Sequence, residues 1–447
     1  MYFILVALLL VFRIALFVYF VVTEGQYLAL DSAGYINLAT NLIDYQTFSS
    51  SLQPPLEIDF FRTPGYPFFL VLLKYLGCGS PYWIGFWQEL LYCFSAWLFY
   101  HYSQPLFGKK IARVGLLFLL IEPGGFAYPK FILSETLFIP FVTLGLLFIG
   151  HYLKYKNWKY IVISAFIMGL GILVRPVLLY LPVVISFILI IFDFHSRQRW
   201  LHSMLLLLII TLTISPWLVR NLQSSGKIFI SGQQSNLLAN YHVPYVWELV
   251  KEIPFRKGQK IIANKVHAAI KKQEQTQDHL LTQIERYKVQ QDVAVKELAK
   301  YPVEYTERWV IGVIKAILEV NLIKLNYVIK VPLNKVGAVE ANIGVNFYNK
   351  VWDYLNGQSG LALVFLAFRG LIAIFSLLGA FAIYRSKDCF LWIIMLSNFY
   401  FIFSAGPVGS ARFRLPIEVF WFIQAYYGFF WICSFWESQK KRIPIGK

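Results

Sequence analysis

The 447-residue sequence is poor in charged residues and lacks the motifs of the commonest soluble enzymes. Charged residues make up 15% of the chain, whereas soluble domains carry about a quarter. The four cysteines are scattered and form neither a zinc-site pattern nor a disulfide framework. No P-loop, HExxH, Gly-x-Ser-x-Gly or strand-following GxGxxG motif is present. These absences argue against a soluble domain and against the usual nucleotide-binding, zinc-peptidase and serine-hydrolase sites.

The sequence is correspondingly rich in long apolar runs. Apolar residues make up 58% of the chain, and the mean hydropathy is +0.57. Many runs approach the roughly 20 residues that a spanning helix needs, whereas barrel strands alternate over about ten. We therefore predict an all-α, polytopic membrane helix bundle of about ten spans. The spans are expected at residues 2–22, 83–101, 111–126, 136–151, 160–174, 177–192, 201–217, 361–384, 390–405 and 415–435.

The first expected span contains an arginine. Arg13 interrupts residues 2–22, and an arginine inside a membrane is costly unless it pairs or snorkels to the interface. Both alternatives are open at the level of sequence. No small-residue cleavage site follows this span, so we expect a retained anchor and not a signal peptide.

The distribution of Lys and Arg over the short loops predicts the orientation. One side holds Lys109, Lys110, Arg113, Lys154, Lys156, Lys159, Arg197, Arg199, Arg385, Lys387, Lys440, Lys441, Arg442 and Lys447. The other side holds only Lys130, Arg175, Arg412 and Arg414. Because cytoplasmic loops carry the excess of positive charge, both termini are expected in the cytoplasm. The net charge of +17 is therefore attributed to topology and not to nucleic-acid binding.

Three regions follow from this topology. They are an N-terminal transmembrane module (1–217) with an acidic first outer loop (23–82), an outer, periplasmic helical segment (218–360), and C-terminal transmembrane helices with a basic cytoplasmic tail (361–447). Residues 259–301 lack Gly and Pro and are expected to be helical. Residues 63–77 and 309–318 are apolar but too short to span, so both are expected to be surface helices.

Two carboxylates and five arginines are expected together at the outer face. They are Asp31 and Glu135, with Arg62, Arg175, Arg220, Arg412 and Arg414. Arginines bind phosphate through a planar, bidentate fork, and a carboxylate can take the proton of an acceptor as general base. Such a set suits the transfer of a sugar from a lipid phosphate at the interface. Tyr35 and Tyr66 are candidates for contact with the sugar or acceptor, although interfacial aromatics are commonly membrane-belt residues.

Each of these residues also has a structural alternative. Arg412 and Arg414 could bind lipid headgroups in general, and Arg175 could belong to a helix cap and turn. Glu135 could be a carboxylate favoured by the helix dipole, and Asp31 could be a simple loop acid. Carboxylates also suit hard divalent cations, so Asp31 and Glu135 leave a metal-binding alternative open. No spacing requires a metal, and none is assigned.

Several short motifs, in their order along the chain, resemble the GT-C membrane glycosyltransferases. They are LDSAGYINLATNL, FFRTPGYPFFLVLL, FILSETLF, LGILVRPV, SPWLVRN and ARFRLPI. The sequence is most similar to polyprenyl-phosphate-mannose protein mannosyltransferases and lipid A aminoarabinose transferases, over about the first 225 and last 90 residues. The resemblance implies a catalytic acid at Asp31, a phosphate-binding residue at Arg62 and a second acid at Glu135. Some family members have an Asp-Glu pair where this chain has Asp31-Ser32, and the aminoarabinose enzymes have lysine where it has Arg62.

These observations predict an integral-membrane glycosyltransferase of the cytoplasmic (inner) membrane, with its active site facing the periplasm. It would move a hexose or pentose from a polyprenyl-phosphate donor to a lipid, glycan or protein acceptor, with inversion. The expected partners are the donor, the acceptor and membrane lipids, and not nucleic acid. Two alternatives stay open. An O-antigen ligase or polymerase would not need the acid after the first span, and a lipid-linked glycan flippase or transporter would be expected to carry charges near the midplane.

Overall fold

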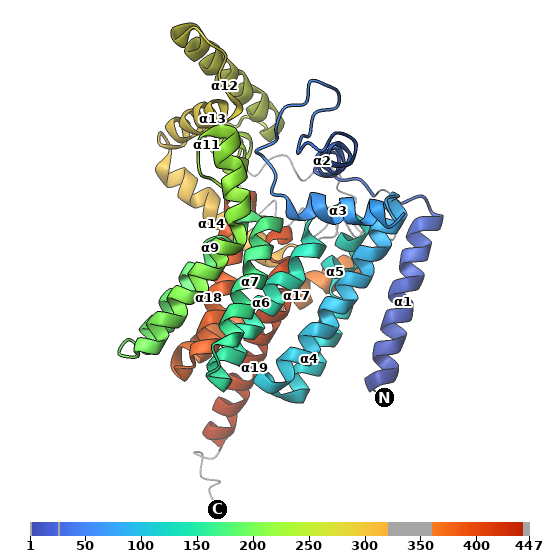
Figure 1. Cartoon of the computed structure of the whole chain (residues 1–447). Coiled ribbons are helices and arrows are strands. Elements are labelled where there is room, and N and C mark those ends of the chain that lie inside the picture. Colours follow the sequence, from blue (N-terminus) through green and yellow to red (C-terminus); the bar gives the residue numbers. More distant parts are fainter. Residues whose placement is uncertain (1, 26, 321–359, 441–447) are drawn as a thin grey trace, which may run out of the picture.

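Helices form all the regular structure in residues 2–25, 27–320 and 360–440, the part of the chain that the computed structural model describes (Figure 1). No strand occurs within these ranges, which confirms the all-α prediction. Four of the described helices are long and apolar enough to cross a membrane, or five if a bent pair beginning at α4 forms one span. The four are α1 (Tyr2–Val22), α6 (Glu135–Tyr155), α9 (Arg197–Ser225) and α17 (Gly360–Ser386). The chain is therefore a polytopic membrane protein.

The other predicted spans also coincide with helices. They are α4 (Pro81–Ile121), α7 (Lys159–Val174), α8 (Leu181–Ile191), α18 (Cys389–Ser404) and α19 (Glu418–Lys440). α4 covers two of the predicted spans, and the backbone breaks between them at Gly108. Its φ of 82° and ψ of 160° are readily adopted only by glycine. Because α7, α8 and α18 are shorter than a typical span, the count of ten stays a prediction.

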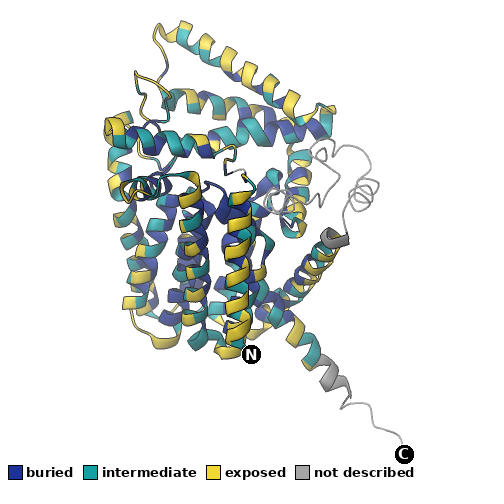
Figure 2. Ribbon diagram, turned by 90° about the vertical axis from the view of Figure 1, so that its right-hand side faces the viewer, coloured by how far each residue is buried: buried dark blue, intermediate teal, exposed yellow. Residues whose placement is uncertain are grey.

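α6 lies at the centre of the bundle and α1 at its edge. In α6, 78% of the membrane-length window is buried, compared with 17% in α1. Figure 2 shows exposed residues along much of α1. Arg13 is the exception, since it is completely buried and its Nε donates to Glu89 Oε1 at 2.6 Å. Its other nitrogens donate to the carbonyls of Leu120 and Gly125, and Lys130 Nζ reaches Glu89 Oε2 at 3.1 Å. Arg13 is thus paired and does not snorkel, and it fastens α1 to the bundle.

Two helices form in the region that follows α1. α3 (Gly65–Tyr75) lies across the ends of the membrane helices in Figure 1, and it confirms a short helix within the predicted 63–77. α2 (Ser32–Tyr45) lies within the predicted first outer loop and is a helix that we did not predict. The physical reason is visible in the pattern Tyr35, Leu38 and Ala39, an i, i+3, i+4 spacing that buries one helical face.

The outer segment is mostly helical between Gln233 and Leu318. Its elements are α10 (Gln233–Leu237), η3 (Leu238–His242), α11 (Val243–Lys251), α12 (Phe255–Gln277), α13 (Gln283–Leu298) and α14 (Pro302–Leu318). The helical structure predicted over 259–301 is confirmed for residues 259–277 and 283–298, and the chain turns between these two helices at Asp278 (φ 54°). Thr282 and Glu285 then start α13 with a reciprocal capping box. The apolar piece 309–318 is the second half of α14, and residues 321–359 of the predicted segment lie outside the described part.

Candidate active site

Asp31 stands at the N-terminus of α2 and is bound by two arginines from distant parts of the chain. Arg62 Nη2 lies 2.7 Å from Asp31 Oδ1, and Arg412 Nη1 lies 2.7 Å from Asp31 Oδ2. The Asp31 side chain keeps 29% of its exposure, so a ligand can reach it. Burial alone would raise the pKa of Asp31, but the charges and hydrogen bonds of Arg412 and Arg62 hold it well below its usual range. Asp31 is therefore an ionised, accessible carboxylate.

Glu135 is the second carboxylate of the site and pairs with two arginines, Arg175 and Arg412. It is the first residue of α6 and is completely buried. Arg175 Nη1 is 2.6 Å from Glu135 Oε1, and Arg412 Nε contacts the same oxygen. These contacts are ion pairs whose angles fall outside hydrogen-bond geometry. Arg412 thus bridges Asp31 and Glu135, and five of the predicted site residues (Asp31, Arg62, Glu135, Arg175 and Arg412) meet in one cluster.

The cluster carries a surplus of positive charge. Three arginines (Arg62, Arg175 and Arg412) face two carboxylates (Asp31 and Glu135), which leaves a formal charge of +1. The arginine side chains are between 12% and 26% exposed, so they lie in a partly desolvated setting. Charges in such a setting interact with a bound anion more strongly than fully solvated charges would.

The two predicted tyrosines lie one behind the other. The guanidinium of Arg62 sits 4.5 Å from the ring centroid of Tyr35, and its Nη1 donates to the Tyr35 hydroxyl at 3.3 Å. That hydroxyl donates in turn to Ser134 Oγ, next to Glu135. Tyr66 is completely buried and donates to Gln88 Oε1 at 2.7 Å. Tyr35 therefore touches the cluster, whereas Tyr66 packs edge-on against Tyr35 and supports it from behind.

Arg220 does not join the carboxylates. It lies near the C-terminal end of α9 and donates to the Asp59 carbonyl at 3.0 Å and to Asn221 Oδ1 at 2.8 Å. Its guanidinium stands 4.5–5.2 Å from the centroids of three rings, those of Phe48, Phe60 and Trp217. The structure thus places Arg220 in an aromatic cage behind the turn that carries Arg62.

Arg414 points away from the cluster although it is only two residues from Arg412. It is completely buried, with its Nε 2.7 Å from Glu418 Oε1. Its remaining nitrogens donate to the carbonyls of Ala316, Ile317 and Glu319, at the end of α14. These carbonyls have no partner within the helix, so Arg414 acts as a C-terminal cap of α14.

Tyr241 is a residue near the site that the sequence did not single out. It belongs to η3, a π-helical turn of the kind that is frequent at functional sites. Burial raises the pKa of Tyr241, the charge of Asp31 raises it further, and the charge of Arg62 lowers it. Both charges therefore act on the Tyr241 hydroxyl. Because Tyr241 lies in a long polar stretch without a motif, no sequence signal points to it.

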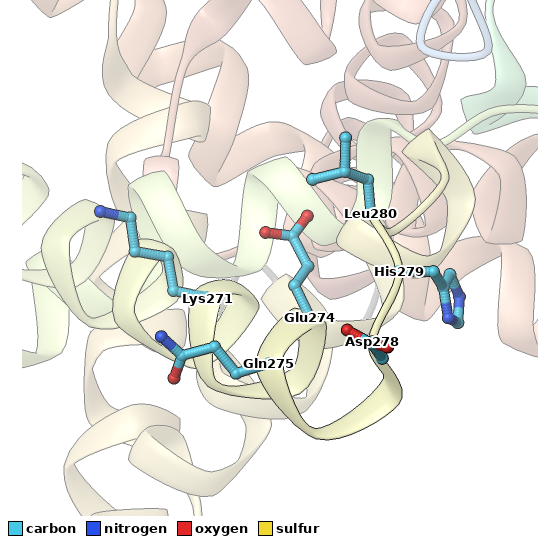
Figure 3. A pocket seen from close by; sticks show the side chains of 6 residues that line it. All are labelled: Lys271, Glu274, Gln275, Asp278, His279 and Leu280. Carbon is cyan, nitrogen blue, oxygen red and sulfur yellow. The ribbon is translucent and has the colours of Figure 1, made fainter.

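Neither a metal-ligand group of the described ranges nor the surface pocket near the end of α12 involves the residues of this cluster. Within the described ranges, no three His, Cys, Asp or Glu side chains gather as metal ligands. The surface pocket in Figure 3 lies at the turn between α12 and α13 and is open to solvent. Its lining residues are Lys271, Glu274, Gln275, Asp278, His279 and Leu280, none of which is a predicted site residue.

Comparison with known proteins gives one family and several solved structures. Residues 62–219 match the family described as dolichyl-phosphate-mannose-protein mannosyltransferase. No curated protein matches the chain.

Among solved structures, ArnT from Cupriavidus metallidurans bound to undecaprenyl phosphate has a TM-score of 0.43 and 12% identity, covering 95% of this chain and 77% of that one. The oligosaccharyltransferase of Archaeoglobus fulgidus, tethered to an acceptor peptide, has a TM-score of 0.48 and 13% identity, covering 90% of this chain and 45% of that one. The match over residues 62–219 spans Arg62, Glu135 and Arg175 and shows that the chain is similar to the protein mannosyltransferases, as its motifs predict for a GT-C membrane glycosyltransferase.

Proposed function

We propose that this protein transfers a sugar from a polyprenyl-phosphate donor to an acceptor at the outer face of the membrane. The observation that carries the proposal is the cluster in which Arg62 and Arg412 pair with the accessible Asp31, and Arg412 and Arg175 pair with the buried Glu135. A phosphodiester-linked donor has a single negative charge, which would balance the formal charge of +1 on this cluster. The family match over residues 62–219 supports the same class of reaction.

Arg62 and Arg412 are the residues proposed to bind the donor phosphate. Both reach the partly exposed Asp31, and each offers a guanidinium suited to phosphate oxygens. Arg175 is held by the buried Glu135 and adds positive charge from behind. As the sugar–oxygen bond breaks, the departing polyprenyl phosphate gains a second negative charge. Positive groups already in place stabilise that charge without reorganising.

Asp31 is the proposed general base. The acceptor atom attacks the anomeric carbon, its proton passes to Asp31, and the electron pair of the broken bond leaves with the phosphate oxygen. Arg62 and Arg412 hold the pKa of Asp31 low in the free protein. A donor phosphate that draws these arginines toward itself would relieve part of this effect. The pKa of Asp31 would then rise toward the range in which a carboxylate accepts a proton more readily.

Glu135 is proposed as a positioning residue rather than a second base. Its side chain is completely buried, and its Oε1 meets both Arg175 and Arg412. A buried carboxylate with two cationic partners can fix their directions but has no exposed path to an acceptor. Tyr35, stacked under Arg62, is the proposed contact for the sugar ring or the donor phosphate.

The orientation of the site is also a proposal. The charge count over the short loops supports a site that faces away from the cytoplasm, which in a bacterial inner membrane is the periplasm. The three-region division at residues 217 and 360 follows from the same topology. From the description of the matching family, we propose mannose as the first donor sugar to test and protein as the first acceptor.

The test is incubation of the purified protein with a panel of polyprenyl-phosphate sugars, beginning with mannose, and measurement of released polyprenyl phosphate. The proposal expects release that depends on an added lipid, glycan or peptide acceptor. Movement of the intact donor between vesicle leaflets without release would support a flippase instead. Transfer from a polyprenyl-diphosphate glycan, but from none of the monophosphate donors, would support a ligase or polymerase.

A further inference from the structure

Asp59 is a buried carboxylate that the proposed mechanism does not use. It lies three residues before Arg62 and is only 4% exposed. Its Oδ1 accepts the backbone N–H groups of Phe61 at 2.8 Å and of Arg62 at 2.9 Å, and its Oδ2 accepts the Ser50 hydroxyl at 2.6 Å. An aspartate that binds the backbone two and three residues ahead fixes a turn. The turn that it fixes ends at Arg62.

The backbone around Asp59 is held from both sides as well. The Asp59 N–H donates to the Phe48 carbonyl at 2.8 Å, and the Asp59 carbonyl accepts Arg220 Nη1 at 3.0 Å. The next two carbonyls, of Phe60 and Phe61, accept the Gly232 N–H at 2.9 Å and the Ser231 hydroxyl at 2.6 Å. The first outer loop, the end of α9 and the start of the outer segment therefore all meet at this turn.

The residues after Arg62 tie the turn to a second arginine of the site. Thr63 Oγ1 donates to the Val174 carbonyl at 3.0 Å, and Val174 directly precedes Arg175. Gly65 lies so close to the same strip of backbone that a Cβ there would be 2.9 Å from the Leu173 carbonyl oxygen. No side chain fits at that position without a shift. The turn at Asp59 and the contact at Thr63 together fix Arg62 relative to Arg175.

We propose that Asp59 is a positioning residue that holds Arg62 where the donor phosphate binds. This inference rests on the proposed function of Arg62. The three hydrogen bonds of the Asp59 carboxylate have no role at the reacting atoms, because none of its partners is Asp31, Glu135 or Arg412. Their common effect is to set the direction in which the Arg62 side chain leaves the backbone. A carboxylate suits this task because both of its oxygens only accept, as the two N–H groups and the hydroxyl require.

Two substitutions separate this role from general stability. Asp59→Ala removes all three acceptors, whereas Asp59→Asn keeps the Oδ1 acceptor and the side-chain volume. Displacement of a positioning group by about 1 Å can cost on the order of 100-fold in rate. Asp59→Ala is therefore expected to lower donor kcat/KM by about 10- to 100-fold, and Asp59→Asn by clearly less. Asp44→Ala, which removes an exposed carboxylate of α2, is the matched control and should match the wild type.

The decisive measurement is a double-mutant cycle with Arg62→Ala, using donor kcat and KM from the release of polyprenyl phosphate. If Asp59 acts through Arg62, adding Asp59→Ala to Arg62→Ala should cost less than about twofold. A full additional loss in the double variant, or wild-type kinetics in Asp59→Ala, would overturn the inference. If Arg62→Ala alone has wild-type kinetics, the assignment of Arg62 to the donor site fails. That result can be told apart from additive losses in the double variant, which would overturn only the positioning role of Asp59.

Hydrogen–deuterium exchange of the peptide containing residues 59–66 gives a readout that needs no activity. Asp59→Ala should speed its exchange, and Asp59→Asn should lie between Asp59→Ala and the wild type. Unchanged exchange in Asp59→Ala would overturn the positioning role even if no donor sugar is found. Faster local exchange in a protein that transfers no sugar would support the positioning of Arg62 and count against the proposed function.

Discussion

Replacement of Arg412 by alanine should weaken donor use more than any other single change among the arginines. Arg412 is the one residue that contacts both carboxylates of the cluster, with Nη1 2.7 Å from Asp31 and Nε against Glu135. Its removal takes the formal charge of the cluster from +1 to 0. A hydrogen bond to a charged group contributes about 1.5–3 kcal/mol, and each 1.4 kcal/mol corresponds to a factor of about ten. The expected loss in donor kcat/KM is therefore about 10- to 100-fold.

The assay is donor saturation at fixed acceptor concentration, with released polyprenyl phosphate as the signal. Arg256→Ala is a suitable control, because Arg256 is an exposed residue of α12 and makes none of the ion pairs found in the described ranges. Size-exclusion profiles and Tm should show that both variants are folded. Donor kinetics of Arg412→Ala equal to those of the control would refute the reasoning, since the cluster would then bind no phosphate.

Two further outcomes follow from the charges of the chain and the site. Gln275 is an exposed residue of α12, and the variant Gln275→Cys should react with a membrane-impermeant thiol reagent in intact cells. The labelling should exceed that of the wild type, which has only the four native cysteines. Protection until the cells are permeabilised would reverse the proposed orientation. The depressed pKa of Asp31 means that the carboxylate stays ionised as pH falls through the ordinary carboxyl range near 4, so donor kcat/KM should show no acid limb from Asp31 between about pH 7 and 5. An acid limb in that interval that disappears in Asp31→Asn would contradict the ion pairs described here.

The sequence was sufficient to predict the members of the cluster that lie at helix ends. Asp31, Glu135 and Arg175 sit where apolar runs stop, and alternating spans bring such positions to one face of a membrane. Arg412 lies between the last two predicted spans, so the same alternation predicts it at this face. The ion pairs show that these residues lie together, whereas Arg220 and Arg414, which we expected with them, lie elsewhere. The phosphate-binding role itself stays a proposal.

Arg414 shows why the same argument failed to separate neighbours. The backbone from Ala411 to Phe413 is a 3-10 turn, in which successive residues are about 120° apart. The side chains of two residues that are two positions apart in such a turn therefore point in widely different directions. Arg412 therefore faces Asp31 while Arg414 faces Glu418 and the end of α14. Charge and sidedness are the same for both residues, so only the local backbone distinguishes them.

Arg220 depended on packing that a single sequence does not reveal. It satisfies the carbonyl of Asp59 and is surrounded by rings from residues 48, 60 and 217, and these tertiary contacts decide where it lies. α2 is different, because the spacing of Tyr35, Leu38 and Ala39 in the sequence already indicates a helix that buries one face. Its polar residues and its place between apolar helices led us to a loop instead.

The most direct test of the account is the turnover of Asp31→Asn. This change keeps the size of the side chain and its ability to accept a hydrogen bond from Arg62 or Arg412, but it removes the basic carboxylate. Loss of a general base typically costs about 10²- to 10⁴-fold in rate. We expect a fall of that size in kcat, with donor KM changed much less, in protein that has the wild-type expression and Tm. Transfer at the wild-type rate by Asp31→Asn would contradict the central claim that Asp31 takes the acceptor proton.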